Sequence, residues 1–292
     1  MGRVASQGYA TLAGSLPLMS DTTRQRLARV TRRADSDLAE AALCICAEAN
    51  GAVDVDAGML RLDAIADALR TRGGLPRNDL EAAAASLRGY LAGQCGYSGN
   101  VDDYYDPANG LLTEVLDRRQ GLPITLSILY IAVARRLDVP AWGIAHPGHY
   151  YVGIGTRDNT IVLDPFQGGE VVTQSELADR LRAATAGQIE FTRAHLRSAG
   201  PALTTRRLLN NLTRDYTNRG AVHDALWTVE LKLVLPNALP DDHRVRGDLL
   251  SHVGRYGEAA DEYEQYLDLL GAQADDADEI RARAIRARAK LN

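Results

Sequence analysis

The sequence lacks the patterns that mark several common protein classes. Its three cysteines, Cys44, Cys46 and Cys95, form no C-x-x-C pair, and an odd number without a secretory signal argues against a disulfide framework. No apolar run approaches the roughly 18 residues that a membrane-spanning helix needs. The first twenty residues also lack a basic segment followed by an apolar stretch. These absences predict a cytoplasmic protein with no membrane association.

Signatures of metal, nucleotide and nucleic-acid binding are missing too. The six histidines are dispersed, with neither H-x-x-x-H nor H-E-x-x-H spacing. The pairs Gly73-Gly74 and Gly168-Gly169 lack the strand, helix and lysine that accompany a phosphate-binding loop. The net charge of −5 is mild for 292 residues, and the arginines are scattered among acids rather than gathered in a basic stripe. We expect no metal, no cofactor and no nucleic-acid partner.

What the sequence does contain is a helical first third. Apolar residues recur at helical spacing in two segments, at Leu38, Ala41, Ala42 and Ile45 and again at Leu60, Ala64 and Leu69. A third helix is predicted over residues 78–92, and the many Gly, Asn and Asp residues of 93–110 predict a long loop, a kind of segment that is often functional. We interpret residues 1–20 as a disordered N-terminus.

The middle of the chain changes from helix to strand. A short helix is predicted over 111–119 and a longer one over 123–137, with Pro123 in the first turn, where proline is tolerated. Three segments rich in β-branched and aromatic residues then predict antiparallel strands, over 142–146, 149–155 and 160–166. This order of elements predicts an α+β domain over residues 21–200.

From Ala202 the pattern is helical again and contains an internal repeat. Gly220, Asp224-Ala225, Glu230 and Leu233 recur 34 residues later as Gly254, Glu258-Ala259, Glu264 and Leu267. This is the tetratricopeptide period, in which a small residue lies where two helices cross. We therefore predict an all-α, tetratricopeptide-like region over 201–292. Two repeats are too few for a free-standing solenoid, so we expect this region to pack on the first domain.

Three segments carry a resemblance to a known family: NGLLTEVLDRRQGLPITLSILY (109–130), PGHYYV (147–152) and VLDPFQGGE (162–170). Together they resemble the transglutaminase-like superfamily, in the branch of bacterial invasion-regulator proteins of the SirB type. The resemblance spans about residues 35–290. It implies a helical N-terminal section, a central helix, an antiparallel sheet and tetratricopeptide-like C-terminal helices.

The family's catalytic layout is only partly present. In the family, a cysteine thiol at a helix N-terminus is activated by the helix dipole, a strand histidine takes its proton, and an acid on the next strand orients the imidazole. When the chain is aligned through Leu137-Asp138-Val139-Pro140, the histidine and the acid fall on His149 and Asp164, but the nucleophile falls on Pro123. The resemblance therefore implies a divergent member without the thiol.

Three residues are candidates to replace the thiol. Thr125 and Ser127 lie on the central helix, but neither is well placed by its helical angle, and such hydroxyls ordinarily bond a carbonyl one turn back. Cys95 lies in the predicted loop. The sequence leaves these alternatives open, with the ordinary structural role favoured for each.

The binding residues that we predict are Thr125, Tyr151 and Asn109. Tyr151 shares the strand face of His149 by the two-residue period, so we expect it to wall the same cleft. Gly110 follows Asn109 where we expect a serine, which argues against a hydroxyl contributed by that loop. We expect His146 to be structural.

Two hypotheses of different class follow. In the first, His149 is oriented by Asp164 and acts as general acid and base on a carbonyl-containing acyl or amide substrate, a small molecule or a peptide, in hydrolysis, cyclisation or isomerisation. In the second, catalysis has been lost and the cleft and the helical repeats bind a peptide or protein partner. The retained His–Asp pair favours the first hypothesis, and Pro123 with the repeats favours the second. We prefer the enzyme.

Overall fold

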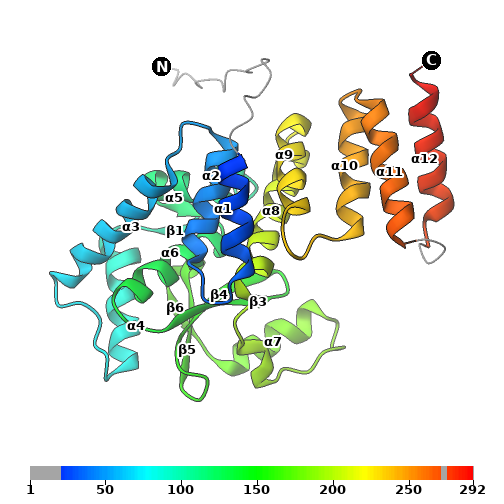
Figure 1. The fold of residues 1–292 in the computed structure, drawn as a ribbon. Helices are drawn as coiled ribbons and strands as arrows, with labels where there is room; N and C mark the ends of the chain where they lie inside the picture. The colour runs from blue at the N-terminus through cyan, green and yellow to red at the C-terminus, as the bar shows by residue number, and fades with distance from the viewer. Residues whose placement is uncertain (1–20, 271–274, 292) are drawn as a thin grey trace, which may run out of the picture.

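The structure, a computed structural model, describes residues 21–270 and 275–291. Helices surround a small antiparallel sheet, and a row of further helices continues toward the C-terminus (Figure 1). The predicted α+β class is confirmed. The segment 1–20, which we interpret from its sequence as disordered, lies outside the described residues.

The N-terminal part contains four helices, α1 Asp21–Arg32, α2 Leu38–Ala49, α3 Val55–Arg70 and α4 Leu80–Arg88. Aspartates cap the last three of them. The side chains of Asp37, Asp54 and Asp79 each accept a hydrogen bond from a backbone N–H in the first turn of the helix that follows. Helix α2 is buried from Leu38 to Ala47 except at Glu40 and is therefore an inner helix.

The apolar face of α3 differs from the sequence prediction. Leu60 is 67% exposed and Ala64 is exposed as well, whereas Leu62 is buried. Gly58 approaches α2 so closely that a Cβ atom there would lie 2.5 Å from the Leu43 side chain. Because this contact fixes which side of α3 meets α2, the predicted face at Leu60 and Ala64 is wrong.

The predicted loop 93–110 contains short regular pieces. A π-helical turn, Gly89–Gln94, extends α4, and β1, Ser98–Gly99, pairs in parallel with β2, Gln120–Gly121. A 3-10 turn, Pro107–Gly110, leads into α5, Leu112–Arg118. The segment is therefore a series of short regular pieces that connects α4 to the central helix.

The central helix is α6, Pro123–Arg136, and its residues from Pro123 to Ala134 are all buried. It packs against a four-stranded antiparallel sheet of order β3-β4-β5-β6. The strands are β3 Ala141–His146, β4 His149–Gly155, β5 Thr160–Asp164 and β6 Glu170–Val172. The first two match the predicted strands, whereas the third ends two residues before the predicted end, because Pro165 begins a 3-10 turn. Strand β6 is not predicted because three residues are too few to give a recognisable alternation.

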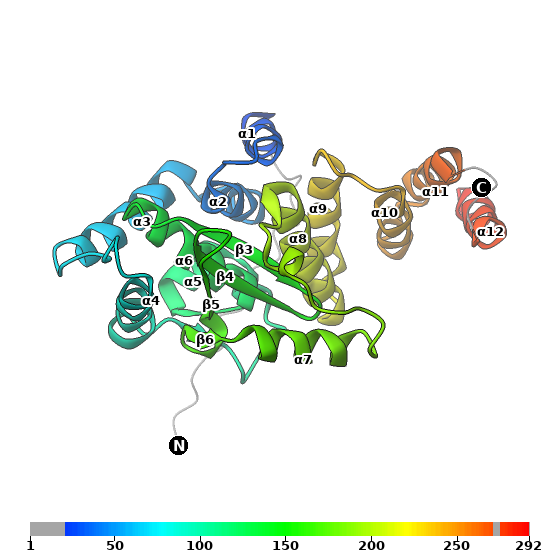
Figure 2. The ribbon, with the colours of Figure 1, turned by 90° about the horizontal axis from the view of Figure 1, so that it is seen from below.

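The two faces of the sheet meet different layers. Tyr150 and Val152 belong to the main core with α6, whereas Tyr151 and Val162 join Leu177 of α7, Gln174–Ala184, in a separate cluster. Figure 2 shows α6 and α7 on opposite sides of the sheet. By the two-residue period of a strand, His149 and Asp164 lie on the α7 side.

The C-terminal helices are α8 Gly200–Asn218, α9 Val222–Leu233, α10 Pro240–His252, α11 Tyr256–Leu270 and α12 Ala277–Ala289. The positions of the 34-residue repeat occupy equivalent places in them. Gly220 and Gly254 follow α8 and α10 with left-handed φ angles of 71° and 81°. Ala225 and Ala259 are both fully buried in the next helices. Each glycine thus allows the chain to reverse between two antiparallel helices.

The C-terminal helices contribute to two separate hydrophobic clusters. Leu208, Leu209 and Leu212 of α8 belong to the main core, together with Leu231 and Leu235, whereas a second cluster joins α9 to α10, α11 and α12. Helix α8 thus packs on the sheet-bearing part, and the later helices extend away from it (Figure 1). The domain division at residue 200 remains a prediction. In the part of the chain that the structure describes, no helix is long and apolar enough to cross a membrane.

Candidate functional site

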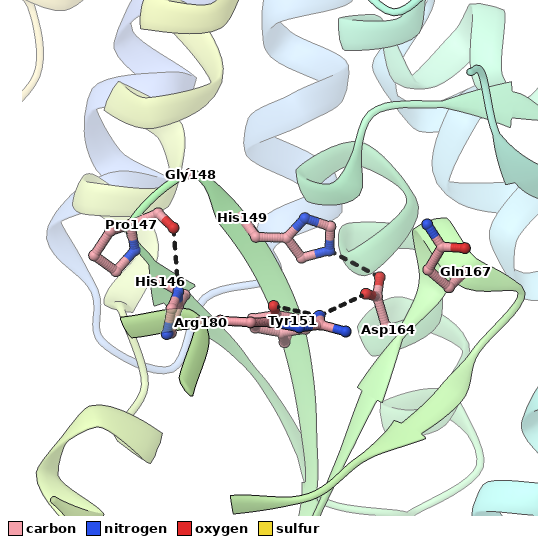
Figure 3. A pocket seen from close by; sticks show the side chains of 8 residues that line it. All are labelled: His146, Pro147, Gly148, His149, Tyr151, Asp164, Gln167 and Arg180. Atoms are coloured by element: carbon pink, nitrogen blue, oxygen red, sulfur yellow. Dashed lines mark hydrogen bonds and ion pairs between the residues drawn. The ribbon is translucent and has the colours of Figure 1, made fainter. Parts of the chain in front are cut away.

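His149 and Asp164 lie in direct contact at one edge of the sheet. His149 begins β4 and Asp164 ends β5, and Nε2 of His149 lies 2.9 Å from Oδ1 of Asp164 (Figure 3). Because an ionised carboxylate only accepts hydrogen bonds, Nε2 carries the proton and donates it, and Nδ1 keeps its lone pair. Nδ1 has no hydrogen-bond partner among residues 21–270 and 275–291. The ring is therefore held in the tautomer of a base.

The carboxylate of Asp164 is buried, with 2% of its side chain exposed, but both oxygens have donors. Oδ1 also accepts the backbone N–H of Phe166 at 3.2 Å, and Oδ2 lies 3.4 Å from Nη1 of Arg180. The bond to Phe166 arises because Asp164 caps the 3-10 turn Pro165–Gln167. A buried acid with three donors is fixed in place and cannot rotate away from His149 without losing them.

Tyr151 and Arg180 form the wall beside the dyad. The Tyr151 ring lies 4.5 Å from the His149 ring, centroid to centroid, and its hydroxyl accepts a hydrogen bond from Nη1 of Arg180 at 2.7 Å. Burial raises the pKa of the Tyr151 hydroxyl, and Arg180 opposes that shift. The hydrogen bond to Tyr151 in turn raises the pKa of Arg180. Both side chains are thus kept in their protonated forms at neutral pH.

A cavity of about 400 Å³ opens beside these groups, lined by His146, Pro147, Gly148, His149, Tyr151, Asp164, Gln167 and Arg180 (Figure 3). The His149 side chain is 22% exposed and that of Arg180 is 45% exposed, so a small molecule can reach both. Neither Gln167 nor Arg180 is predicted from the sequence. Gln167 directly follows the Asp-Pro-Phe segment, and this closeness to Asp164 is a sequence signal for it. Arg180 gives none, because it is one of several arginines among acids on an amphipathic helix.

The hydroxyls of the central helix lie elsewhere. Thr125 and Ser127 are fully buried and do not line this cavity. Ser127 Oγ donates to the carbonyl of Tyr150 on β4 at 3.4 Å, and Thr125 Oγ1 has no hydrogen-bond partner among the described residues. Our expectation that both bond a carbonyl one turn back is therefore wrong, because the Ser127 hydroxyl bonds strand β4 and the Thr125 hydroxyl has no partner among the described residues. The binding role predicted for Thr125 is not supported at this cavity.

Asn109 organises the loop instead of lining the cavity. It is fully buried, its Nδ2 donates to the carbonyl of Asp103 at 2.8 Å, and its carbonyl accepts the N–H of Leu122 at 3.1 Å. The predicted binding role of Asn109 is thus replaced by one in tying the loop to the residue that precedes α6. Gly110 is explained by packing, since a Cβ atom there would lie 2.8 Å from the Leu212 side chain of α8.

None of the three free cysteines lines the cavity. Burial raises the pKa of the Cys44 thiol to about 12 and also raises that of Cys46. Cys95 is partly buried. The pKa of the neighbouring Tyr90 hydroxyl is raised by the burial of Tyr90 and by its hydrogen bond with Cys95. In the described ranges, no group of three or more His, Cys, Asp or Glu side chains is arranged to hold a metal ion.

This arrangement, a histidine and an acid on adjacent strands beside a buried central helix, defines a transglutaminase-like protein. A family model described as "Transglutaminase-like superfamily" matches residues 57–210. The chain belongs to this superfamily. The UPF0162 protein of Xylella fastidiosa is 36% identical over 188 residues, which cover 63% of this chain and 67% of that protein.

Other relatives and one solved structure are more distant. The UPF0162 protein of Pseudomonas aeruginosa is 30% identical over 216 residues, covering 73% of this chain and 77% of that protein. F-box only protein 21 of Mus musculus is 32% identical over 126 residues, covering 39% of this chain and 20% of that protein. A crystal structure of menin, described as revealing the binding site for Mixed Lineage Leukemia (MLL) protein, covers 92% of this chain and 68% of its own, with a TM-score of 0.43 and 11% identity.

Proposed function

We propose that the protein is a divergent transglutaminase-like enzyme that uses His149, oriented by Asp164, as general base and then general acid on a carbonyl-containing substrate. The observation that carries this proposal is the 2.9 Å contact between Nε2 and the buried carboxylate, which leaves Nδ1 as the basic nitrogen of a ring that lines a cavity of about 400 Å³. Asp164 fixes the tautomer and stabilises the imidazolium that forms.

The simplest reaction is hydrolysis of an acyl or amide bond by water. Nδ1 of His149 takes a proton from the attacking water as its oxygen bonds to the carbonyl carbon. When the carbon–nitrogen or carbon–oxygen bond breaks, the imidazolium returns that proton to the leaving group. Cyclisation follows the same proton path with a nucleophile from the substrate itself. No covalent acyl intermediate forms, because Pro123 stands where the family's thiol is expected and carries no nucleophile.

We also propose that the chain belongs to the SirB-type branch and that residues 201–292 form a tetratricopeptide-like region. The left-handed glycines 220 and 254 and the buried alanines 225 and 259, each pair 34 residues apart, support this assignment. A cytoplasmic location is part of the same proposal, since three free cysteines suit a reducing compartment.

A binding scaffold is the second candidate, and one observation favours it. A further cavity of about 400 Å³ lies among α10, α11 and α12, and its lining includes Arg283, Arg286 and Lys290. In this alternative the helices capture a partner, and the cavity beside His149 is a remnant of an older active site.

Substitution of the dyad tests the enzyme. A panel of small esters, small amides and peptide amides is screened with the wild-type chain, and the turnover found is compared in His149→Ala and Asp164→Asn. Because general acid and base catalysis contributes about 10² to 10⁴-fold, each variant should lose activity in that range while keeping its thermal unfolding midpoint. His223→Ala, an exposed histidine of α9, is the matched control and should retain full activity. Full turnover in both dyad variants overturns the proposal.

The absence of a thiol from the proposed mechanism gives a second prediction. Cys95→Ser should be as active as the wild type, and pre-treatment with iodoacetamide should leave turnover unchanged, because the mechanism uses no sulfur. Loss of activity in Cys95→Ser, with the fold intact, would mean that Cys95 supplies a relocated nucleophile.

A further inference from the structure

The cavity beside the dyad offers few free acceptor groups, of which Nδ1 of His149 is one. Its one acidic side chain, Asp164, has both oxygens engaged, by His149 and Phe166 at Oδ1 and by Arg180 at Oδ2. Both ring nitrogens of His146 face backbone carbonyls, so neither is a free acceptor toward the cavity. A ligand in this cavity therefore meets hydrogen-bond donors and the charge of Arg180, together with the lone pair on Nδ1 of His149.

Arg180 is the strongest of these donors. Only its Nη1 is used, by Tyr151 at 2.7 Å and Asp164 at 3.4 Å, and within the described part of the chain Nη2 and Nε have no partner. The side chain is 45% exposed, so these groups remain accessible. A guanidinium offers paired N–H groups in a fork that matches a carboxylate, and such charge-assisted pairs are strong and directional.

We propose that the substrate of this site carries a carboxylate that binds Arg180. This inference rests on the function proposed above and names its substrate class. His149 contacts one oxygen of the Asp164 carboxylate, and Arg180 contacts the other. A ligand carboxylate bound to Arg180 therefore places the next few atoms of the ligand beside the imidazole. The substrates are small acids whose reacting acyl or amide carbonyl lies a few bonds from the carboxylate, and a cavity of about 400 Å³ is of the size that holds such molecules.

The same helix supplies a matched control for the charge of Arg180. Arg182 lies two positions further along α7, its side chain is 68% exposed, and it pairs with Asp179 at 2.8 Å. It does not line the cavity. Arg180→Gln and Arg182→Gln change the net charge equally, so a difference between them reports the position of the charge rather than its presence.

Binding is tested on the full chain with glutarate and its neutral analogue glutaramide, by calorimetry and by the imidazole resonances of His149. The wild type should bind glutarate at least about tenfold more tightly than glutaramide, because a hydrogen bond to a charged group is involved. Arg180→Gln should lose about tenfold or more in glutarate affinity. Arg182→Gln should stay within about twofold. The glutarate affinity of Arg180→Lys, which keeps the charge without the fork, should lie between those of Arg180→Gln and Arg182→Gln.

Equal binding of glutarate and glutaramide by the wild type overturns the inference, as does an unchanged glutarate affinity in both Arg180 variants. Thermal unfolding of each variant is measured alongside, and Arg180→Lys decides the matter if Arg180→Gln does not fold. Failure of the proposed function has a different signature: glutarate binds through Arg180, yet substitution of His149 leaves turnover unchanged. Turnover that needs His149 but acts on neutral substrates alone would keep the function and refute the substrate class.

Discussion

Arg207 of α8 donates a hydrogen bond from Nη2 to the carbonyl oxygen of His149 at 2.8 Å. Its guanidinium also lies over the ring of Tyr150, 5.7 Å from the centroid, and Thr204, one turn earlier, bonds the Tyr150 hydroxyl at 2.6 Å. The first two residues of β4 are thus held by the helix that begins the C-terminal region. Arg206, the preceding residue on α8, bonds Asp242 of α10 at 2.5 Å, so two adjacent arginines on α8 link the dyad to the later helices.

Substitution of Arg207 should therefore disturb the dyad without removing any part of it. Arg207→Met should reduce turnover about tenfold and shift the His149 imidazole resonances, because the orphaned carbonyl no longer fixes the start of β4. Arg207→Lys should recover part of both effects. Turnover, its pH profile and the resonances are measured together, since a purely structural role would lower stability but leave the histidine signals and the pH profile of the folded protein unchanged.

Gly110 should not accept the side chain that the family resemblance suggests. A serine Cβ would lie 2.8 Å from the Leu212 side chain, at a contact between the loop and α8. Overpacking of this kind costs about 1–3 kcal/mol. Gly110→Ser should lower the free energy of unfolding by that amount in urea titrations, and Gly110→Ser combined with Leu212→Ala should show less than the sum of the two single losses. Strict additivity would contradict the contact.

Alkaline pH should destabilise the fold through Tyr150. Burial raises the pKa of its hydroxyl from 10.0 to about 12, with the Thr204 bond and the Arg207 charge opposing. Between these values the unfolded chain releases the proton and the folded chain keeps it, so the stabilisation is complete below pH 10 and is lost as pH rises. Between about pH 8 and pH 11, the free energy of unfolding should fall by roughly 1 kcal/mol less in Tyr150→Phe than in the wild type, as measured by urea titration. Equal slopes in the two proteins would refute this assignment.

The parts of the fold that sequence could predict are those with a local signal. The helical run of α6 begins at Pro123, and the alternating segment of β4 begins at His149, as their patterns indicate. The contact between His149 and Asp164 was predictable because both stand at ends of neighbouring strands joined by a short turn. The family resemblance supplied the chemistry that periodicity cannot supply.

The other residues around the site are brought there by contacts between segments distant in the sequence. Arg180 reaches the dyad across the α7 face, 16 residues after Asp164, and Arg207 reaches His149 from 58 residues away. Neither position differs in sequence from the surface arginines around it. Thr125 and Asn109 were assigned to binding, and nothing in their local sequence reveals that both side chains are enclosed.

Removal of the C-terminal helices tests how far they are part of the same folded unit. Leu208, Leu209 and Leu212 of α8 belong to the main core, so a fragment ending at residue 200 loses these partners and exposes an apolar surface. It should aggregate. A fragment ending at 236 keeps α8 and α9 and loses only α10 to α12, whose contacts form the second cluster.

This longer fragment should stay folded, although the exposed Ala225, Leu226 and Val229 face of α9 should lower its unfolding midpoint and its solubility. Sedimentation and thermal unfolding of the two fragments and the full chain provide the measurement. Because α8 also carries Arg207 and Thr204, the shorter fragment should show no native His149 resonances even in any soluble portion. A monomeric, cooperatively folded 1–200 fragment with native resonances would mean that α8 neither completes the core nor positions the dyad.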